Sequence, residues 1–280
     1  MTVTTVEPWT TRLLPDSVSR PSSAERANED AVRVGPGLAV VVDGAGVDHR
    51  FRAGCQHSVS WYANKLADAL YDRFHDRRLG PREALALAIG HVRNLHGAAC
   101  ILQDGSPSAT VAAFRTHGDK LEYMVLCDAA VLLVPSSDEP QLVTDTLVEG
   151  VAARASTYRE ELRTRGVPET MAAESTARFV EMHRNHPEGF WVAQDDPKVA
   201  DHAISASVPL EGLRAVVACS DGITRALDRL ALHDVASLAT ALVDSPLGAV
   251  VDEIRAAEDD GTDRPGKRHD DATAAVLRFG

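Results

Sequence analysis

Residues 213–230, LRAVVACSDGITRALDRL, contain two patterns that could act on phosphate, and the two are incompatible. Cys219 and Arg225 are separated by five residues, the spacing of a cysteine-dependent phosphatase loop. Asp221 lies between them in a Ser-Asp-Gly turn, where a carboxylate could bind a metal at the end of a strand. That carboxylate would also repel a phosphate cradled between the thiol and the arginine. The pattern therefore favours Asp221 over Cys219 as the chemically active residue.

Further carboxylates occur beside the most apolar strands. Asp43 ends LAVVVD, Asp128 ends YMVLCD, and Asp270 and Asp271 precede ATAAVLRF. If the last strand is antiparallel to those that carry Asp43 and Asp221, these side chains meet at one rim. Carboxylates at such a rim repel, and they either take up protons or bind a cation. Oxygen ligands suit Mg²⁺ or Mn²⁺ and give no reason to expect zinc. The alternative is that each Asp-Gly is an ordinary turn.

The stretch ERANEDAV adds three charged residues just before the first buried strand. A hairpin would place Arg26, Glu29 and Asp30 near the Asp43 end of that strand. The alternative for this stretch is an exposed charged turn.

Other nucleophile and metal patterns are weak. The four cysteines, Cys55, Cys100, Cys127 and Cys219, include no Cys-x-x-Cys pair, and the last two end apolar runs, which predicts buried reduced thiols. His49 and His57 are interpreted as surface or helix residues, and HRNH at 183–186 shows no zinc spacing. In EDDGTD, Asp259 follows a helical pattern, which is wrong for an aspartyl-phosphate nucleophile. A Gly-x-Ser-x-Gly elbow is absent from the sequence.

The apolar pattern predicts the elements that must position these residues. We expect helices at 59–74, after Pro81 (with Leu85, Ala88, Ile89, Val92, Leu95 and Ala99 on one face), through 147–185 with a break at RGVPE, at about 228–245 and at 247–257. Strands are expected at 37–44, in a meander between SATVAAFRT and AVLLVPSSDEP, at AISASVPL, at 213–219 and at the C-terminal end. Two consecutive helices between strands favour antiparallel sheets over βαβ units. The predicted fold class is α+β, with two stacked antiparallel sheets flanked by helix pairs.

Composition limits the partners. The 280-residue chain is 44% hydrophobic and 25% charged, with a formal net charge of −12 and no basic stripe, which argues against nucleic acid. No apolar stretch reaches the ~18–20 residues that span a bilayer, and the first residues resemble no secretion signal. We therefore expect a cytoplasmic protein that forms one domain over 1–280, with no membrane partner. The sequence does not indicate an oligomeric state.

Taken together, the motifs resemble the metal-dependent protein phosphatases of type 2C. The matching elements occur in the family's order from about residue 20 to the C-terminus: RANEDAV, VVVDGAG, SATVAAF, VLCDAAVLL, ACSDGITRALD and HDDATAAVLRF. The resemblance implies a β-sandwich flanked by helices, a two-metal site at one end, and a variable flap-like segment at about 147–201. It also implies hydrolysis of phosphoserine or phosphothreonine by a water activated between two Mn²⁺ or Mg²⁺ ions. The alternatives are a small-molecule phosphatase on the same fold and an inactive relative that binds phosphoproteins.

The resemblance also assigns roles. Asp43 would bridge the two metals and the Gly44 carbonyl would bind one of them, while Asp221 and Asp270 complete the second. Glu29 and Asp30 would hold water on the metals, Arg26 would grip the phosphate, Asp128 would contribute to a third, weaker metal, and Asp271 would support Asp270. The sequence departs from the family at Glu25, where a basic residue is common, at Ala45, where some members have a histidine, and at CDAA, which replaces Gly-Asp-Ser-Arg.

Overall fold

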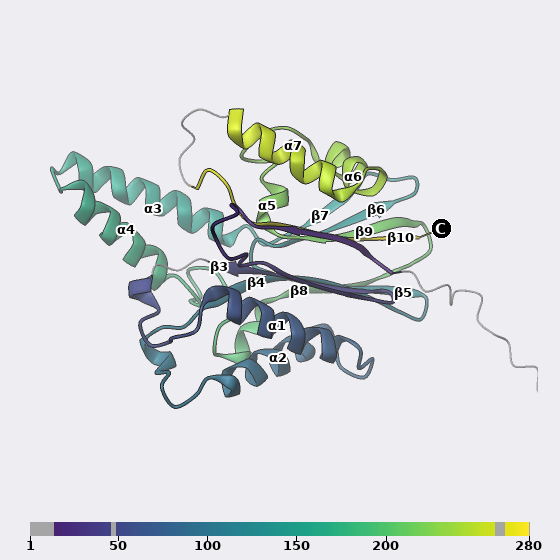
Figure 1. Ribbon diagram of the computed structural model, residues 1–280, viewed down its shortest axis with the longest axis horizontal. Coiled ribbons are helices and arrows are strands. Elements are labelled where there is room, and N and C mark those ends of the chain that lie inside the picture. Colours follow the sequence, from purple (N-terminus) through teal and green to yellow (C-terminus); the bar gives the residue numbers. More distant parts are fainter. Residues whose placement is uncertain (1–13, 46–48, 261–266, 280) are drawn as a thin grey trace, which may run out of the picture.

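Two five-stranded antiparallel sheets stack face to face, with helices on both outer faces (Figure 1). The computed structural model describes residues 14–45, 49–260 and 267–279. The strand order is β2-β3-β4-β5-β8 in the first sheet and β1-β10-β9-β6-β7 in the second. The predicted α+β sandwich is confirmed.

The strands are short and pair antiparallel throughout. The first sheet contains β2 (Ala31–Gly35), β3 (Leu38–Ala45), β4 (Ser108–His117), β5 (Lys120–Leu126) and β8 (Ile204–Pro209). The second contains β1 (Asp16–Arg20), β10 (Ala272–Arg278), β9 (Leu213–Cys219), β6 (Ala130–Pro135) and β7 (Gln141–Val143).

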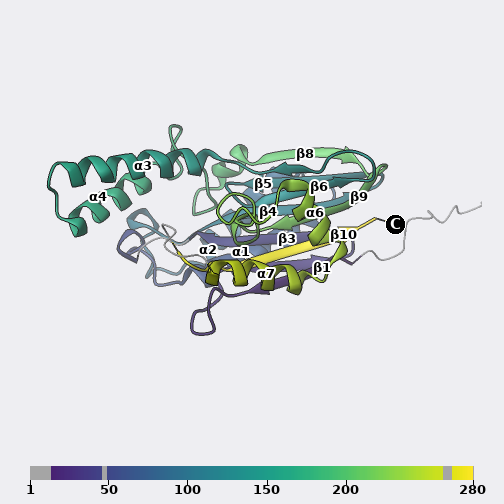
Figure 2. The ribbon, with the colours of Figure 1, turned by 90° about the horizontal axis from the view of Figure 1, so that it is seen from above.

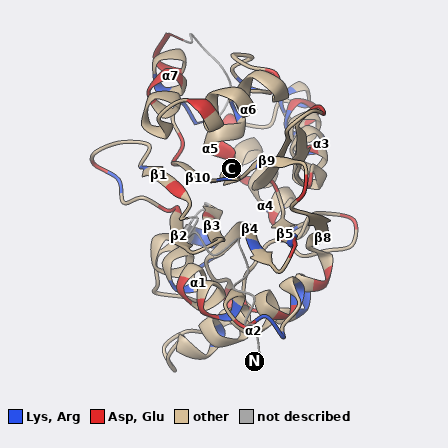
Figure 3. Ribbon diagram, turned by 90° about the vertical axis from the view of Figure 1, so that its right-hand side faces the viewer, with Lys and Arg blue, Asp and Glu red and all other residues tan. Residues whose placement is uncertain are grey.

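The helices form two outer layers and one projecting arm (Figures 1 and 2). The first sheet is covered by α1 (Val59–Phe74) and α2 (Pro81–Leu95), and the second by α6 (Val235–Asp244) and α7 (Leu247–Asp260). The arm consists of α3 (Leu147–Thr164) and α4 (Glu169–Met182). Shorter turns are α5 (Asp221–Thr224) and the 3₁₀ turns η1 (His49–Phe51), η2 (Leu102–Asp104) and η3 (Pro197–His202). Acidic and basic residues are interspersed over the outer helices (Figure 3).

Side-chain alternation along the strands builds three apolar layers. On β3, Leu38, Val40 and Val42 pack against α1 and α2, whereas Ala39 and Val41 face the other sheet. On β9, Val217 and Cys219 face α6 and α7, whereas Val216 and Ala218 face the first sheet. The next inward-facing position after Val41 is therefore Asp43, at the end of the inter-sheet core.

The element boundaries differ from the sequence expectation in several places. The predicted 59–74 helix is confirmed, but α2 ends at Leu95, which is 43% exposed, so Ala99 lies outside it. The helix expected from about 228 begins at Val235, where the Asp234 carboxylate accepts from the Ser237 backbone N–H. The pattern also missed β1 and β2, which are short strands with mixed exposure. Within the described residues, no helix is long and apolar enough to cross a membrane.

A buried arginine connects the α1–α2 turn to the first sheet. The Arg115 side chain is 1% exposed and donates to the Phe74 carbonyl at 2.9 Å and to the Leu79 carbonyl. It also donates to the Glu122 carboxylate at 2.6 Å, across the β4–β5 pair. One guanidinium therefore satisfies carbonyls at the end of α1 that apolar surroundings would otherwise leave unpaired.

We expect Arg115→Leu to lower the free energy of unfolding by roughly 2–4 kcal/mol, because carbonyls and a carboxylate lose their partner. Urea denaturation measures this loss. Arg78→Leu is the matched control, because the Arg78 side chain is 89% exposed and pairs with Asp76 at the surface, so its unfolding midpoint should match the wild type. Equal midpoints for both variants would contradict a structural role for Arg115.

Candidate active site

The first carboxylate of the site is placed by strand alternation. Asp43 follows Val41 on the inter-sheet face of β3, and the residue is only partly exposed. Its register partner on β4 is Thr110, whose buried hydroxyl has no hydrogen-bond partner. The inter-sheet core therefore ends in polar groups at this rim.

Asp221 reaches the same rim from the second sheet. It follows β9 as the first residue of α5, and β9 is antiparallel to β10, so the end of β9 lies beside the start of β10. A Cβ atom on Gly222 would lie 1.9 Å from the Asp271 carbonyl oxygen. The expectation that Asp221 and the Asp270–Asp271 pair share one rim is confirmed.

Both Asp-Gly pairs require glycine for close packing, and neither glycine has a positive φ. Gly44 lies within β3 and not in a turn, which corrects the turn interpretation. Its N–H donates to the Glu29 carbonyl at 3.1 Å, and an added Cβ would lie 2.7 Å from that oxygen and 2.4 Å from Val59 Cγ1. The glycine therefore brings β3, the loop before β2 and the start of α1 together.

The loop with the ERANEDAV motif is fastened to the rim by Asp271. This carboxylate is 7% exposed and accepts the backbone N–H groups of Ser22 and Glu29, each at 2.6 Å. Asp30 accepts from the Ser220 hydroxyl at 2.9 Å and directly precedes β2, which pairs with β3 as the hairpin interpretation predicted. The alternative of an exposed turn is wrong for Asp30, which is 4% exposed.

The carboxylates oppose one another's ionisation. Burial, and then the charges of Asp30, Asp221, Asp128 and Asp270, raise the pKa of Asp43 well above its ordinary value. Burial, together with Asp128, Asp270 and Asp30, raises the pKa of Asp221 to about 7. Burial also raises the pKa of Asp30 to about 6, and its Oδ1 atom has no hydrogen-bond partner. Such a set of oxygen donors fits a hard divalent cation, which would supply the missing positive charge.

Asp128 joins this cluster from the turn between β5 and β6. Burial raises its pKa, and the nearby charges of Glu149 and Asp145 raise it further. Cys127, just before it, has a left-handed backbone with φ 63°, which turns the chain sharply at the end of β5. The Asp145 N–H donates to the Cys127 carbonyl at 3.1 Å, so the chain that enters α3 at Leu147 passes beside Asp128.

Asp270 is held by basic residues that the sequence interpretation missed. Lys267 Nζ lies 3.2 Å and Arg225 Nη2 3.7 Å from its carboxylate, and Arg255 donates to its backbone carbonyl. Arg225 and Arg255 both pair with Glu258, which is 4% exposed. The sequence contains one signal that Glu258 is buried. This residue continues the apolar stripe of α7 (Leu247, Val250, Val251 and Ile254) at helical spacing.

The same contacts decide between the thiol and the carboxylate at 219–225. Cys219 packs in the core under α6 and α7, and burial raises the pKa of its thiol to about 12. Arg225 is occupied by Glu258 and does not face that thiol across an open loop. Cys219 and Cys127 are both buried free thiols, as predicted. A protonated, buried thiol is a poor nucleophile, so the geometry agrees with the carboxylate interpretation.

Basic residues act electrostatically on Glu29. Burial raises the pKa of Glu29, while the charges of Lys267, Arg52 and Arg26 act in the opposite direction. Arg26 is exposed in the loop before β2. The sequence interpretation did not identify Arg52, which precedes α1 and donates to the His57 carbonyl at 3.3 Å.

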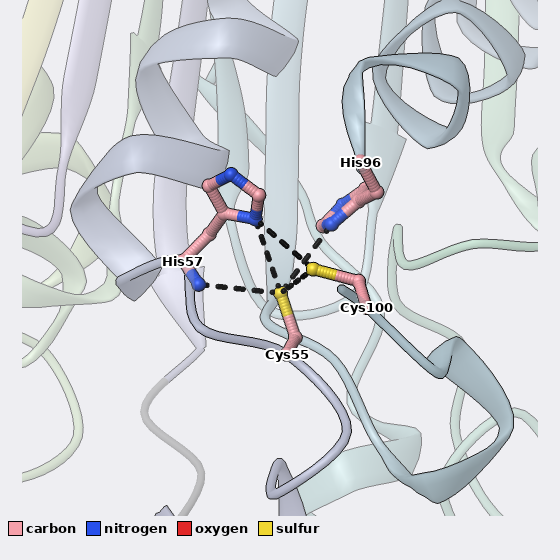
Figure 4. A group of neighbouring side chains, drawn as sticks. All are labelled: Cys55, His57, His96 and Cys100. Atoms are coloured by element: carbon pink, nitrogen blue, oxygen red, sulfur yellow. Dashed lines mark hydrogen bonds between the residues drawn. The ribbon is translucent and has the colours of Figure 1, made fainter. Parts of the chain in front are cut away.

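A second group of side chains corrects the interpretation that the histidines and cysteines are scattered. Cys55, His57, His96 and Cys100 converge, with their ligand atoms all within 4.8 Å of one another (Figure 4). His57 lies in the loop before α1 and is half-buried, so it is neither a helix nor a free surface residue. Sequence spacing could not reveal this, because the pairs come from segments joined by α1 and α2.

The raised carboxylate pKa values predict a pH dependence for the metal-free protein. The folded state keeps a proton on Asp221 up to a pH of about 7, whereas the unfolded chain releases it near the ordinary value of 3.8. The free energy of unfolding therefore falls as pH rises from about 4 to about 7. Asp221→Asn removes this titration, so its Tm relative to the wild type should rise over that range, by at least about 3 °C.

Thermal unfolding in chelator at several pH values measures the difference. Asp138→Asn, at an exposed residue between β6 and β7, is the control and should show no trend. A difference between Asp221→Asn and wild type that stays constant from pH 4 to 8 would show that Asp221 titrates normally.

Comparisons with known proteins place the chain in a family. The family model described as Protein phosphatase 2C matches residues 23–249. Separately, 131 residues (44% of the chain) are 30% identical to hyaluronan synthase 3 of Gallus gallus, and they span 23% of that protein. This second match covers less than half of either chain and does not establish a shared family.

Solved structures show the same fold at low identity. The serine/threonine phosphatase PstP/Ppp of Mycobacterium tuberculosis has a TM-score of 0.58 at 14% identity, covering 95% of this chain and 98% of that one. The Ser-Thr phosphatase MsPP of Mycobacterium smegmatis, in complex with cacodylate, has a TM-score of 0.56 at 18% identity with the same coverage. A PstP catalytic domain in complex with 2 manganese ions has a TM-score of 0.51 at 15% identity, again covering 95% and 98%. With a family match over most of its length and this fold, the chain belongs to the protein phosphatase 2C family of metal-dependent serine/threonine phosphatases.

Proposed function

We propose that this protein removes phosphate from phosphoserine and phosphothreonine with the help of Mn²⁺ or Mg²⁺ held at the carboxylate rim. One observation carries the proposal: Asp43, Asp221 and Asp270 meet beside Asp30, whose buried Oδ1 atom lacks a partner. Buried polar atoms are normally paired, and adjacent carboxylates at neutral pH need positive charge. The bound manganese in the PstP relative supports the same choice of ion.

The residues present can be assigned to that metal centre. Asp43 and the Gly44 carbonyl would bind one cation, with Asp43 shared with a second that Asp221 and Asp270 complete. Asp128 would contribute to a third, weaker site, and Glu29 and Asp30 would order water at the rim. Divalent cations bound there supply charge neutralisation for the phosphate dianion and lower the pKa of water for attack.

The remaining residues position the groups that face the substrate. Asp271 holds the Glu29 backbone, and Ser220 orients Asp30. Arg26 would orient the phosphate by charge-assisted hydrogen bonds from the exposed edge of the rim. Ala45 has no side-chain proton to donate, so the leaving oxygen would need its proton from another donor, and we propose water for this role.

The arm formed by α3 and α4 is the part of the structure most relevant to substrate choice. We propose that the flap-like segment at about 147–201, which contains α3 and α4, contributes to substrate choice. In support, the Asp145 N–H, two residues before α3, donates to the Cys127 carbonyl at 3.1 Å, next to Asp128. A panel of phosphopeptides and phosphorylated metabolites, assayed with Mn²⁺, distinguishes a protein phosphatase from a small-molecule phosphatase. An inactive binding relative has less support, since Asp43, Asp221 and Asp270 are all retained.

The direct test is metal dependence. Protein stripped by a chelator and dialysed should not hydrolyse an aryl phosphate, and Mn²⁺ or Mg²⁺ should restore the activity. Full activity without added divalent ions would contradict the proposal.

Asp43→Asn should be the most damaging single change. It removes a negative charge from the proposed metal centre, so we expect kcat to fall by at least about 100-fold, with weaker Mn²⁺ binding by calorimetry. The variant should still fold, because it also removes carboxylate repulsion from the metal-free protein.

Cys219→Ser is the control for the Asp43 variant. Its thiol packs in the core under α6 and α7 and not between the two sheets, so activity should stay close to the wild type with a modest loss of stability. Normal turnover and Mn²⁺ binding in Asp43→Asn would refute the metal assignment, and a well-folded but inactive Cys219→Ser would revive the thiol mechanism.

Arg26→Ala tests the phosphate contact. Loss of a charge-assisted hydrogen bond should raise KM more than it lowers kcat, with a combined effect of roughly 1.5–3 kcal/mol on kcat/KM. Arg33→Ala is a matched control, since Arg33 lies on β2 and pairs with Asp68 of α1 at 2.7 Å, so the kinetic constants should be unchanged. If Arg26→Ala equals the wild type, another arginine holds the phosphate, and Arg52 is the next to replace.

A further inference from the structure

A sulfur and nitrogen cluster lies outside the carboxylate rim. Cys55 and His57 come from the loop between η1 and α1, and His96 and Cys100 from the loop between α2 and η2 (Figure 4). The Cys55 sulfur is 3.3 Å from Nδ1 of His57, 3.3 Å from Nδ1 of His96 and 3.6 Å from the Cys100 sulfur. The Cys100 sulfur is 3.5 Å from Nδ1 of His57. We call these four residues the Cys/His cluster.

These four separations are close to edges of a zinc coordination tetrahedron, and the other two in the cluster are within 4.8 Å. Zinc binds sulfur at about 2.3 Å and imidazole nitrogen at about 2.0–2.1 Å, so tetrahedral angles put two sulfurs about 3.8 Å apart and sulfur and nitrogen about 3.6 Å apart. The observed values of 3.3–3.6 Å lie within a few tenths of an ångström of these edges. A disulfide is a poorer description, since its sulfurs would be about 2.05 Å apart.

We propose that Cys55, His57, His96 and Cys100 form a structural zinc site that clamps the loop before α1 to the loop after α2. Two thiolates and two imidazoles are the donor set of closed, tetrahedral zinc sites, and they leave no ligand position for substrate. The site is separate from the carboxylate rim, and it does not depend on the proposed function.

The backbone around the cluster is built for close approach of the two loops. The Ile101 N–H donates to the Gly54 carbonyl at 2.7 Å, and the Gly54 N–H donates to the Asp104 carbonyl at 3.2 Å. A Cβ atom on Gly54 would lie 2.0 Å from the Ile101 oxygen, so only glycine fits beside Cys55. The His57 backbone N–H points at the Cys55 sulfur at 3.4 Å, a contact that would stabilise a thiolate.

Neighbouring side chains fix the two imidazoles. The Trp61 ring stacks on His57 with centroids 3.8 Å apart, and its centroid is 5.0 Å from that of His96. Cys55 is 4% exposed, so one thiol is already withdrawn from solvent. Packing around metal ligands sets their orientation and restricts water access.

The proposed zinc site would be connected to the carboxylate rim through the first turn of α1. Ser60 donates to the Asn28 carbonyl at 2.7 Å, and Val59 packs on Gly44, so the first turn of α1 lies against the Glu29 loop. Arg52, between η1 and the cluster, is held by the His57 carbonyl and acts electrostatically on Glu29. Zinc would thereby keep the loop that carries Arg52 in place.

Metal analysis of the full chain tests the site. The wild type, purified without chelator and dialysed against excess Mg²⁺, should retain about one zinc per chain by mass spectrometry. Cys100→Ser and His96→Ala should lose it, and their Tm should fall. The matched controls Cys219→Ser and His91→Ala should keep it, since Cys219 lies in the α6–α7 core and His91 is exposed on α2. Asp43→Asn should also keep it, which separates this site from the carboxylate rim.

A second measurement uses the wild type alone, in case a ligand variant fails to fold. Replacing zinc with Co²⁺ should give the absorption bands of a tetrahedral cobalt–thiolate site, and a mercurial reagent should release about one zinc as two thiols react. Zinc that is absent from the wild type, zinc that Cys100→Ser retains but Asp43→Asn loses, or a Cys55–Cys100 disulfide found by thiol counting would each overturn the proposal.

Discussion

Repulsion among carboxylates at one end of the sandwich is the constraint around which the rest of the structure is arranged. The charges of Asp128 and Asp221 raise the pKa of Asp43, Asp128 also raises the pKa of Asp221, and Asp30 and Asp270 act on both in the same direction. A cluster of this kind opposes folding unless protons or cations neutralise it. The surrounding contacts keep it in place: Asp271 accepts two backbone N–H groups, and Lys267 and Arg225 flank Asp270. The fold thus holds acidic groups together at a local cost in folding free energy when no metal is bound. A hydrophobic core has no such cost, and this distinguishes a binding site from a core.

The two Asp-Gly pairs show how the scaffold reaches this density of charge. Both glycines lie where another backbone carbonyl approaches too closely for any Cβ, Glu29 beside Gly44 and Asp271 beside Gly222. In each case the aspartate beside the glycine is thereby drawn against a segment that brings a further carboxylate. An Asp-Gly pair usually indicates a turn, but in this protein each pair packs one acidic segment against another.

The sequence predicted the strands and the site positions that follow from apolar patterns and motif order. It did not predict features that depend on contacts between distant segments. Runs of apolar residues placed β3, β9, β10 and α1, and the antiparallel order then located Asp43, Asp221 and Asp270 at one rim.

By contrast, the role of Asp271 as the anchor of the Glu29 loop follows from hydrogen bonds across 242 and 249 residues of sequence. The Cys/His cluster was missed for the same reason, since α1 and α2 separate its two halves and only their antiparallel packing brings the halves together. The start of α6 was placed too early because residues after α5 are apolar without being helical.

Two metal chemistries in one chain are compatible because their donor sets differ. Carboxylate and carbonyl oxygens suit Mg²⁺ and Mn²⁺, whereas thiolates and imidazoles prefer zinc, so each proposed site selects against the other's ion through ligand type.

The positions of the two proposed sites also suit different tasks. The carboxylate rim lies at one end of the two sheets and is the proposed place of phosphate hydrolysis. The proposed zinc site is closed by its four ligands and by Trp61, and it lies at the ends of α1 and α2 nearest that rim. A site of the second kind can fix the loop bearing Arg52 without competing for the catalytic ions, so its loss should change the stability and position of that loop before it changes metal binding at Asp43.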